Sequence, residues 1–348
     1  MIHRIAYLPG DGVGPEVSAA ARAVMLRAAE IFGVRLKFDE HDFGGVAIDR
    51  HGDPLPPATL TACLEADAVF LGAVGGPKWD KGGPRPETGL LALRKHLGVY
   101  ANLRPIRVMQ GMERHSPLTA DRAKDVDIFI IRELTGGLYF GEKHEGQERA
   151  SDNCAYTRAE VLRVASIAFE AARGRKGKVA SVDKANVMAT SRLWRAAVIA
   201  LHDAEYRDIE LEHVLVDAMA MKLIQRPAAF DVVLTENLFG DILSDEASVI
   251  AGSIGLAPSA SLGDGARGLF EPIHGSAPDI AGQDKANPAG AILSGAMLLR
   301  FSLKEEAAAR AIERAVEETI AAGYGTADIG GRDSCSAFAA RVVEAVRA

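Results

Sequence analysis

Short apolar runs alternate with longer amphipathic stretches along most of this chain. The segments 3–9 (HRIAYLP) and 68–76 (AVFLGAVGG) are almost continuously apolar, as strands buried on both faces of a sheet usually are. A helix is predicted to begin near Pro15, because proline suits the first position of a helix. This alternation predicts an α/β protein with a largely parallel sheet.

Four more predicted strands lie in the middle of the chain, and each ends at a charged residue before a helix begins. They are 126–131 (VDIFII), 178–182 (KVASV), 212–216 (EHVLV) and 231–235 (DVVLT). The residues that follow them are Arg132; Asp183 and Lys184; Asp217; and Glu236 and Asn237. In an open α/β sheet the carboxyl ends of the strands form the ligand crevice, so this pattern predicts an active site there.

The predicted helix 237–248 (NLFGDILSDEAS) carries Asp241 and Asp245 about one turn apart. Two like charges at this spacing repel each other by roughly a few tenths of a kcal/mol. Either solvent screens the pair or a positive charge lies between them. With Asp217 they provide hard oxygen ligands, which suit Mg²⁺ or Mn²⁺ better than zinc.

Three arginines complete the predicted site: Arg94, Arg104 and Arg132. A guanidinium can hold a carboxylate through two parallel hydrogen bonds. Together with Lys184 and a divalent cation, these arginines point to a small polyanionic substrate. The alternative for each of them, taken alone, is a solvated surface residue.

Two segments rich in glycine and proline, 75–89 and 255–282, are predicted to be long functional loops. The segment 135–157 alternates apolar and polar residues around a glycine-centred turn, which predicts a hairpin with little core of its own. It is either an arm that reaches a partner subunit or an edge hairpin of its own domain.

The length and amino-acid composition are those of a folded enzyme and argue against nucleic-acid-binding and membrane-spanning proteins. A length of 348 residues fits about two domains. The net charge of −7 and the aromatic content of 6% argue against a nucleic-acid partner. Three scattered cysteines suit a reducing compartment, and we find neither a signal-peptide pattern nor an apolar run of membrane-spanning length. We therefore expect a cytoplasmic enzyme with neither nucleic-acid nor membrane partners.

The turn after the first strand does not match the common dinucleotide fingerprint. A G-x-G-x-x-G match that starts at Gly10 requires glycine at position 15, which is occupied by Pro15. A Rossmann fold is therefore disfavoured. We interpret residues 10–14 (GDGVG) as a tight strand-to-helix connection rather than a phosphate cradle.

Taken together, the motifs resemble those of the β-decarboxylating dehydrogenase family, and within it most of all those of the 3-isopropylmalate dehydrogenases. The segments that carry the resemblance, in chain order, are LPGDGVGPEV, GAVGGPKWD, RPETGLLALRKHLGVYANLRP, RELTGGLYFGE, DKANVM, NLFGDILSDEAS, GLAPSASLG and EPIHGSAPDIAGQDKANPAGAILS. They cover essentially the whole chain. The loop between Trp79 and Glu87 is a few residues shorter than in many members of the family.

The resemblance implies a fold other than Rossmann, with two α/β domains around a largely parallel mixed sheet. One domain holds both termini, at residues 1–99 and 252–348, and the other spans 100–251 with the dimer contacts and an arm hairpin at 135–157. The implied reaction is the NAD-dependent oxidative decarboxylation of 3-isopropylmalate to 4-methyl-2-oxopentanoate in leucine biosynthesis. The implied assembly is a homodimer with shared active sites.

The resemblance also implies roles for individual residues. Asp217, Asp241 and Asp245 bind Mg²⁺ or Mn²⁺; Lys184 is the base for the substrate hydroxyl, and Tyr139 is the acid that acts after CO₂ has left. Lys184 and Asp217 enter the partner's site. The substrate-binding residues are Arg94, Arg104, Arg132, Asp217, Glu87, Leu90 and Leu91. The cofactor-binding residues are Gly76, Glu87, His274, Gly275, Ser276, Ala277, Asp279, Ile280 and Asn287, with His274 and Asn287 near the adenine and Asp279 at the ribose.

Several alternatives share part of this pattern. Homoisocitrate, isocitrate and tartrate dehydrogenases have the same metal and arginine residues, so substrate choice is expected to depend on Glu87, Leu90 and Leu91. An apolar Leu90–Leu91 surface suits a branched alkyl group, whereas a third substrate carboxylate calls for serine or a cation there. A phosphotransferase or a non-catalytic metal-binding protein is a remote alternative, and the chain has no G-x-x-x-x-G-K-[ST] loop.

Overall fold

The computed structural model describes residues 2–80 and 82–348 and divides into two compact units. Unit 1 comprises Met1–Val99, Met109–His115 and Gly252–Ala348, and unit 2 comprises Tyr100–Val108 and Ser116–Ala251. The family resemblance implies a single domain at 100–251. The structure instead groups Met109–His115 with unit 1.

The strands of unit 1 lie in the order β2, β1, β3, β12, β11. Their bounds are β1(His3–Gly10), β2(Leu36–Glu40), β3(Ala68–Ala73), β11(Pro258–Leu262) and β12(Leu269–Pro272). β1 runs parallel to β2 and β3, and β12 runs parallel to β3 but antiparallel to β11. The predicted strands 3–9 and 68–76 are thus confirmed as β1 and β3, although β3 ends before the glycines.

The predicted loop 255–282 is partly wrong, because it contains β11 and β12. These two strands pair with each other from Pro258 opposite Pro272 to Ser261 opposite Leu269, and most of their residues are buried. Serine, alanine and proline give a weak strand signal in the sequence. The strands form because their neighbours in the sheet bury them, which a local pattern does not reveal. The predicted loop 75–89 likewise contains the start of α4 at Pro86.

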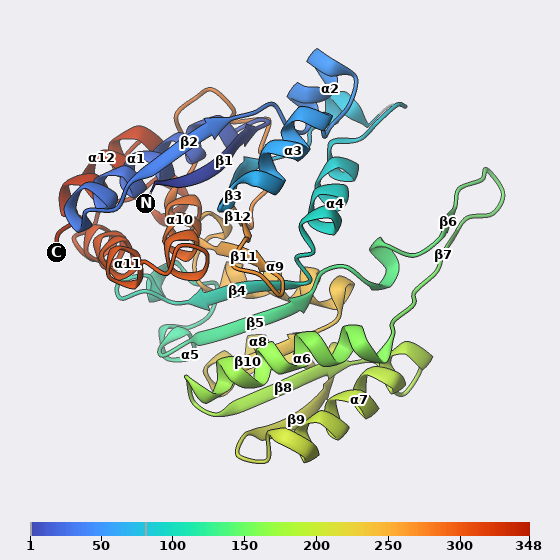
Figure 1. Ribbon diagram of the computed structural model, residues 1–348. Helices are drawn as coiled ribbons and strands as arrows, with labels where there is room; N and C mark the ends of the chain where they lie inside the picture. The colour runs from blue at the N-terminus through green and yellow to red at the C-terminus, as the bar shows by residue number, and fades with distance from the viewer. Residues whose placement is uncertain (1, 81) are drawn as a thin grey trace. The chain divides into compact units, whose positions relative to one another are not determined.

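Helices cover both faces of the unit 1 strands. α1(Gly14–Phe32), α10(Ala289–Phe301), α11(Glu306–Ala321) and α12(Cys335–Ala345) pack together, whereas α2(Gly45–His51), α3(Pro57–Glu65) and α4(Pro86–Leu97) form a separate group (Figure 1). Tyr7 of β1 bonds to Ser18 of α1 at 2.8 Å, while the alternate residue Leu8 joins a core cluster with Cys63 of α3 and Leu93 of α4. Burial on both faces explains why β1 and β3 are apolar throughout.

The strands of unit 2 lie in the order β4, β5, β10, β8, β9. Their bounds are β4(Ala101–Arg107), β5(Asp127–Glu133), β8(Lys178–Asp183), β9(Glu210–Leu215) and β10(Val232–Thr235). β4 is antiparallel to β5, and the other neighbours are parallel, so the sheet is mixed as expected. The four predicted strands are confirmed, and their carboxyl ends lie at one edge.

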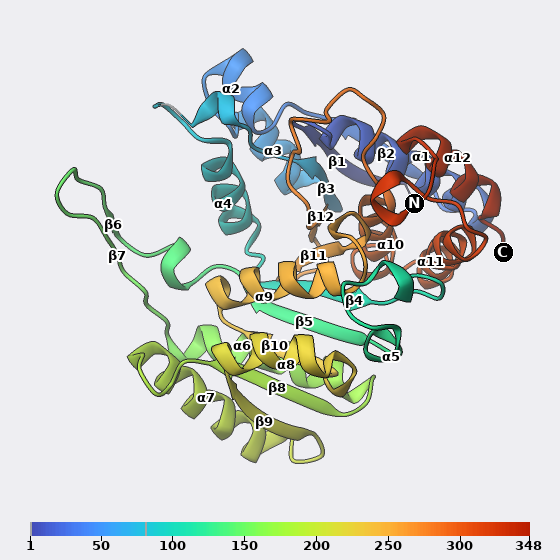
Figure 2. The ribbon, with the colours of Figure 1, turned by 180° about the vertical axis from the view of Figure 1, so that it is seen from behind.

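Two helix layers cover the unit 2 strands. α6(Arg158–Arg173) and α7(Ala189–Glu205) lie on one face, and α8(Val216–Gln225) and α9(Asn237–Ile250) lie on the other; the two views in Figure 1 and Figure 2 show the two layers in turn. A short helix, α5(Ala120–Ala123), precedes β5. Among the described residues of both units, we find no helix whose length and apolar character would allow it to cross a membrane.

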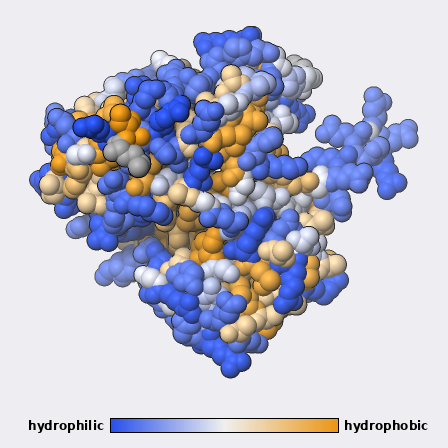
Figure 3. All heavy atoms as spheres, viewed as in Figure 1, coloured by the Kyte–Doolittle hydropathy of each residue, from blue (hydrophilic) through white to orange (hydrophobic). Residues whose placement is uncertain are grey.

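The segment 135–157 contains a hairpin that projects from the rest of unit 2 (Figure 1, Figure 2). Its strands, β6(Lys143–His144) and β7(Ser151–Asp152), have two residues each and pair antiparallel. The side chains from 143 to 152 are exposed, and Figure 3 shows the projecting arm as hydrophilic throughout. An isolated hairpin of this kind is marginally stable in water, so its fold depends on what it packs against.

The first turn of α6 supplies a stability test. Thr157 Oγ1 accepts a hydrogen bond from Glu160 N, and Glu160 Oε2 accepts one from Thr157 N at 2.7 Å. Thr157→Ala is expected to lower the free energy of unfolding by about 1 kcal/mol, because it removes this cap. Urea denaturation measures the change. Thr61→Ala, within α3, is the control and is expected to change stability by less than about 0.5 kcal/mol; equal losses would contradict the capping account.

Candidate active site

The two aspartates of α9 face a pair of buried arginines. α9 begins after β10, where the Glu236 side chain accepts a hydrogen bond from Phe239 N at 2.7 Å. Asp241 Oδ1 accepts a hydrogen bond from Arg132 Nη1 and lies 3.5 Å from Arg104 Nη2. Arg104 Nη1 lies 3.4 Å from Asp245 Oδ1. Of the two alternatives for the aspartate pair, solvent or a nearby positive charge, the structure thus shows positive charge, from two arginine side chains.

Asn237 orients the side chain of Arg132 through hydrogen bonds. Asn237 Oδ1 accepts hydrogen bonds from Arg132 Nε at 3.0 Å and from Arg132 Nη2 at 2.7 Å. Asn237 Nδ2 donates to Gly136 O at 3.0 Å, and Asn237 N donates to the Tyr156 hydroxyl at 3.0 Å. These bonds fix the plane of the guanidinium. From the sequence, Asn237 is recognisable only as the residue that follows Glu236 after a predicted strand, and nothing there indicates this role.

A glycine allows α9 to approach Arg132 this closely. A Cβ on Gly240 would lie 2.3 Å from Thr235 Oγ1 and 2.7 Å from Arg132 Cγ. These distances are too short for non-bonded atoms, so any other residue at this position would displace Thr235 or Arg132. Gly240 thus lets the buried arginine lie directly against the helix that carries Asp241.

Arg104 is held by polar side chains as well. Its Nε donates to Asn102 Oδ1 at 2.6 Å, and its Nη1 donates to Ser244 Oγ at 2.5 Å. Ser244 is buried on α9 between the two aspartates in sequence. Arg104 and Arg132 therefore partly offset the charges of Asp241 and Asp245. Burial, together with the charge of Asp241, still raises the pKa of Asp245, which Arg104 and Arg132 counteract.

Tyr139 joins the same cluster. Its hydroxyl donates to Asp241 Oδ2 at 2.8 Å, and the Arg132 guanidinium carbon lies 5.6 Å from the centre of its ring. Burial and the hydrogen bond to Asp241 raise the pKa of Tyr139 to about 12. The phenol consequently stays protonated near neutral pH and has a proton available to donate.

Lys184 and Asp217 form a separate pair at the same edge of the unit 2 strands. Lys184 follows β8, and its Nζ lies 2.6 Å from Asp217 Oδ1. β9 ends at Leu215, so Asp217 lies in the first turn of α8 and not at the strand end that the sequence predicted. The hydrogen bond from Lys184 lowers the pKa of Asp217.

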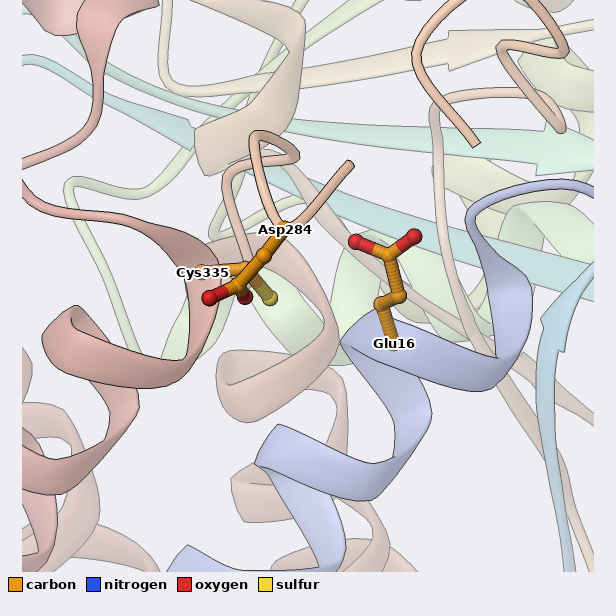
Figure 4. A group of neighbouring side chains, drawn as sticks. All are labelled: Glu16, Asp284 and Cys335. Carbon is orange, nitrogen blue, oxygen red and sulfur yellow. The ribbon is translucent and has the colours of Figure 1, made fainter. Parts of the chain in front are cut away.

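The three predicted metal ligands are not gathered within one chain. Among the described residues, the one set of three potential ligands whose atoms all lie within 4.8 Å is Glu16, Asp284 and Cys335 of unit 1 (Figure 4). The protein already uses most of its oxygens, since Glu16 Oε1 accepts from Gly282 N, Asp284 Oδ1 accepts from Ser336 N at 2.8 Å and Asp284 Oδ2 accepts from Ser336 Oγ. Glu16 Oε2 is buried without a hydrogen-bond partner among the described residues. Asp241 and Asp245 still offer carboxylate oxygens of the kind that Mg²⁺ and Mn²⁺ bind.

On unit 1, α4 presents Glu87, Leu91 and Arg94 at spacings of four and three residues, which places them on one stripe of the helix. Arg94 is buried, and its Nη2 lies 2.9 Å from Glu271 Oε1 of β12, while its Nε is buried without a hydrogen-bond partner among the described residues. Leu90 packs partly against the unit 1 core cluster. Leu91 is half-buried.

The glycines at the end of β3 lie against the start of α4. A Cβ on Gly75 would lie 2.6 Å from Glu87 Oε1, so Gly75 lies close to that carboxylate. Gly76, the next residue, lies against the Trp79 ring. The loop between Trp79 and Glu87 includes residue 81, which lies outside the described residues.

The loop 274–280 contains a buried imidazole with one nitrogen unsatisfied. His274 Nδ1 donates to Gly275 O at 2.9 Å, and its Nε2 is buried without a partner among the described residues. Burial lowers the pKa of His274, so the ring is neutral and Nε2 is an acceptor. Ala277 has a φ of 38°, in the left-handed region that non-glycine residues rarely adopt. The loop thus combines an unpartnered acceptor with a strained backbone.

The other predicted cofactor-binding residues differ in their exposure and in the hydrogen bonds that they already make within the protein. Asp279 is exposed, and Ile280 is half-buried beside it. Asn287 is buried: its Oδ1 accepts from Ala289 N at 3.0 Å at the start of α10, and its Nδ2 donates to Asp328 Oδ2 at 3.0 Å. The Asn287 side chain therefore has a structural role that the sequence analysis did not anticipate.

Known proteins resemble this chain along nearly its whole length. The sequence model of the family described as isocitrate/isopropylmalate dehydrogenase matches residues 4–346. A 3-isopropylmalate dehydrogenase from Anaeromyxobacter dehalogenans is 55% identical over 348 residues, with 98% of each chain covered. One from Vibrio cholerae is 54% identical, covering 94% of this chain and 93% of its own.

Solved structures agree with the sequence comparison. An isocitrate dehydrogenase from Methylococcus capsulatus superposes with a TM-score of 0.88 at 37% identity and covers 100% of both chains. A β-decarboxylating dehydrogenase from Thermococcus kodakarensis has a TM-score of 0.81 at 39% identity, covering 99% of this chain and 96% of its own. The arginine, aspartate and tyrosine cluster, the match along the chain and the shared fold together show that this chain belongs to the isocitrate/isopropylmalate dehydrogenase family.

Proposed function

We propose that this chain catalyses the oxidative decarboxylation of 3-isopropylmalate to 4-methyl-2-oxopentanoate, a step of leucine biosynthesis, with NAD⁺ as the hydride acceptor. The observation that carries the proposal is the identity of 51–55% to proteins named 3-isopropylmalate dehydrogenase over nearly the full chain. The isocitrate dehydrogenase relative is less similar, at 37%. The free cysteines Cys63, Cys154 and Cys335 suit the reducing cytoplasm, where we place the enzyme.

The substrate contacts follow from charge and shape. Arg94, Arg104 and Arg132 hold the two malate carboxylates, and each guanidinium is already oriented by a partner from its own unit. Leu90 and Leu91 contact the isopropyl group beside Glu87. A third carboxylate, as in isocitrate, finds no cation among Leu90, Leu91 and Glu87 of the α4 stripe.

The residues of unit 1 fit a nicotinamide dinucleotide. When bound, NAD⁺ supplies the acceptor for the hydride of the carbinol carbon. The unpartnered Nε2 of His274 offers a hydrogen-bond acceptor for the adenine end, with Asn287 nearby in sequence. The exposed carboxylate of Asp279 accepts hydrogen bonds from the ribose hydroxyls, and Gly76, Glu87 and the backbone of 275–277 complete the contacts.

The carboxylates of unit 2 fit a divalent cation. Asp241 and Asp245 of one subunit and Asp217 of the partner would hold Mg²⁺ or Mn²⁺, which supplies Lewis acidity toward the substrate's oxygens. Lys184, which donates to Asp217 in the free protein, would act as the neutral amine once Asp217 binds the cation, and its Nζ would then accept the proton of the substrate hydroxyl. Tyr139, which remains protonated because its pKa is raised, donates a proton to the carbon that CO₂ has left.

The surface of unit 2 supports a homodimer with shared sites. On α8, Met221 and Ile224 are exposed at spacings of four and seven residues from Asp217, so they share its stripe. On α9, Ile242 and Val249 are exposed on the stripe of Asp245. α8 and α9 pack against each other, and their combined apolar surface suits a second copy of the chain beside the metal ligands. The 143–152 arm, without a core of its own, also suits a partner contact.

The apolar residues of α4 generate the first test of this function. Burying three more carbons is worth about 2 kcal/mol at ~0.8 kcal/mol per carbon, so kcat/KM is expected to favour 3-isopropylmalate over malate by at least roughly thirtyfold. Leu90→Ser and Leu91→Ser are expected to reduce this ratio. Leu97→Ser, which also disturbs the α4 packing, serves as the control and should leave it unchanged. Equal rates for both substrates would contradict the assignment of the alkyl pocket.

The exposed Asp279 predicts the cofactor preference. A carboxylate at the ribose repels a 2′-phosphate, so kcat/KM is expected to be much higher with NAD⁺ than with NADP⁺. Asp279→Asn is expected to narrow the difference, whereas Asp53→Asn, also in unit 1, should have no effect. Measuring both cofactors with each variant tests this, and a native preference for NADP⁺ would show that Asp279 lies elsewhere.

The shared site predicts rescue between two inactive variants. Lys184→Ala removes the base and Asp241→Ala removes a metal ligand, so each homodimer is expected to be nearly inactive. In a mixed dimer, one site combines the intact Asp241 of one chain with the intact Lys184 of the other. Random pairing makes about half of the dimers mixed, so about a quarter of all sites should recover. Activity after co-refolding at equal concentrations is the measurement.

A matched pair of variants controls this experiment. Lys184→Ala and Asp217→Ala affect residues that enter the same site from the same chain, so a mixture of these two variants should remain inactive. Recovery there, or none with the first pair despite folded heterodimers, would show that each site is formed within one chain.

A further inference from the structure

The turn 10–14 (GDGVG) is packed against protein backbone, which leaves no room for a phosphate cradle of the common kind. A Cβ on Gly10 would lie 1.9 Å from Ala73 O, and one on Gly14 would lie 2.3 Å from Pro9 O. A Cβ on Gly12 would lie 1.9 Å from Ser276 O. The glycines of this motif are therefore needed for close contact with β3 and with the 274–277 loop.

Asp11, inside this turn, accepts hydrogen bonds from two other segments of unit 1. Its Oδ2 accepts from Gly45 N at 2.7 Å and from Gly75 N at 2.9 Å, and its Oδ1 accepts from Val46 N at 2.8 Å. The side chain is buried, with 5% of the residue exposed. Gly45 and Val46 are the first residues of α2, whose own N-cap residue, Gly44, provides no side-chain hydrogen bond. Asp11 thus caps this helix from 34 residues away.

The same turn fixes the backbone on the predicted cofactor side. Gly75, which donates to Asp11, adjoins Gly76, and a Cβ on Gly75 would collide with Glu87 Oε1. Val13 N donates to Ser276 O at 2.8 Å, which ties the other predicted cofactor loop to the turn. Two residues of the motif, Asp11 and Val13, therefore tie both the 75–76 loop and the 274–277 loop to this turn.

We propose that Asp11 is a positioning residue for cofactor binding: its carboxylate fixes the 75–76 loop in the conformation that receives the dinucleotide, while Val13 fixes the 274–277 loop. This rests on the proposed function, in which Gly76 and Ser276 contact NAD⁺. Asp11 acts through the backbone that it holds and touches no reacting atom.

The chemistry of the side chain explains why the position needs a carboxylate. An ionised carboxylate only accepts hydrogen bonds, and both of its oxygens are used here. Asparagine has the same shape, but its amide nitrogen is a donor and would face at least one of the three N–H groups. Asp11→Asn therefore removes one or two of the anchoring bonds with little change in volume.

The test compares Asp11→Asn with Asp67→Asn. Asp67 also accepts one long-range backbone hydrogen bond in unit 1, from Arg4 N at 2.8 Å, but holds neither cofactor loop. Two measurements are made: hydrogen exchange of the Gly45, Val46 and Gly75 amides in the cofactor-free protein, and the Kd for NAD⁺ by calorimetry. For Asp11→Asn we expect faster exchange at these amides and a Kd for NAD⁺ raised by about tenfold. Asp67→Asn should change neither.

Steady-state kinetics separate positioning from a general loss of structure. Asp11→Asn is expected to raise KM for NAD⁺ by about tenfold while changing KM for 3-isopropylmalate and kcat less than about threefold. A general loss of structure would instead lower kcat in proportion to the folded fraction. If Asp11→Asn does not fold, Asp11→Ser takes its place, because a hydroxyl leaves no buried charge and reaches fewer of the three amides.

The possible outcomes separate the positioning role of Asp11 from the proposed NAD-dependent function. Faster amide exchange with an unchanged Kd for NAD⁺ would overturn the positioning role of Asp11 and leave the proposed function intact. Unchanged exchange at the three amides would also overturn it. A native protein that binds no NAD⁺ would overturn the proposed function, and the cofactor role of Asp11 with it.

Discussion

The close contact between Asp241 and the buried Arg132 is the interaction on which the candidate active site depends. A guanidinium that is 1% exposed must be paired, because an uncompensated buried charge is very costly. Asp241 supplies that pairing, and in doing so it orients Tyr139, whose hydroxyl donates to its second oxygen. The negative charge of Asp241, which repels Asp245 along the helix, is thus the charge that binds Arg132 and orients Tyr139.

The three arginines share a design in which each is oriented before any ligand arrives. Asn237 holds Arg132, Asn102 and Ser244 hold Arg104, and Glu271 holds Arg94. Hydrogen-bond donors that are fixed in advance need no reorganisation when they meet charge, and this is where much of their effect in catalysis arises. Arg132 and Arg104 also pair with Asp241, and Arg104 with Asp245, so a dicarboxylate that binds these guanidiniums meets groups that already carry anionic partners.

The protein stabilises the carboxylates of Asp241 and Asp11 in two different ways. In unit 2, the Asp241 carboxylate meets arginine side chains. In unit 1, the Asp11 carboxylate meets three backbone N–H groups, two of them at the start of α2. The first arrangement gives a charged group that can exchange partners with a ligand. The second ties three stretches of backbone together, which suits a scaffold for the loops that follow.

Elements with a local signal could be predicted from the amino-acid sequence alone. The apolar runs of β1, β3, β5, β8, β9 and β10, the helix that carries both aspartates and the family motifs are all readable in order along the chain. The tertiary structure decided the rest: that β11 and β12 are strands, that Asp217 pairs with Lys184 in the first turn of α8, that Asn237 holds Arg132 from 105 residues away, and that Asp11 joins α2 to the 75–76 loop. These features depend on contacts between segments far apart in the chain. A local sequence pattern does not specify which hydrogen-bond donor will pair with which acceptor after the strands have assembled, so only the tertiary structure shows these pairs.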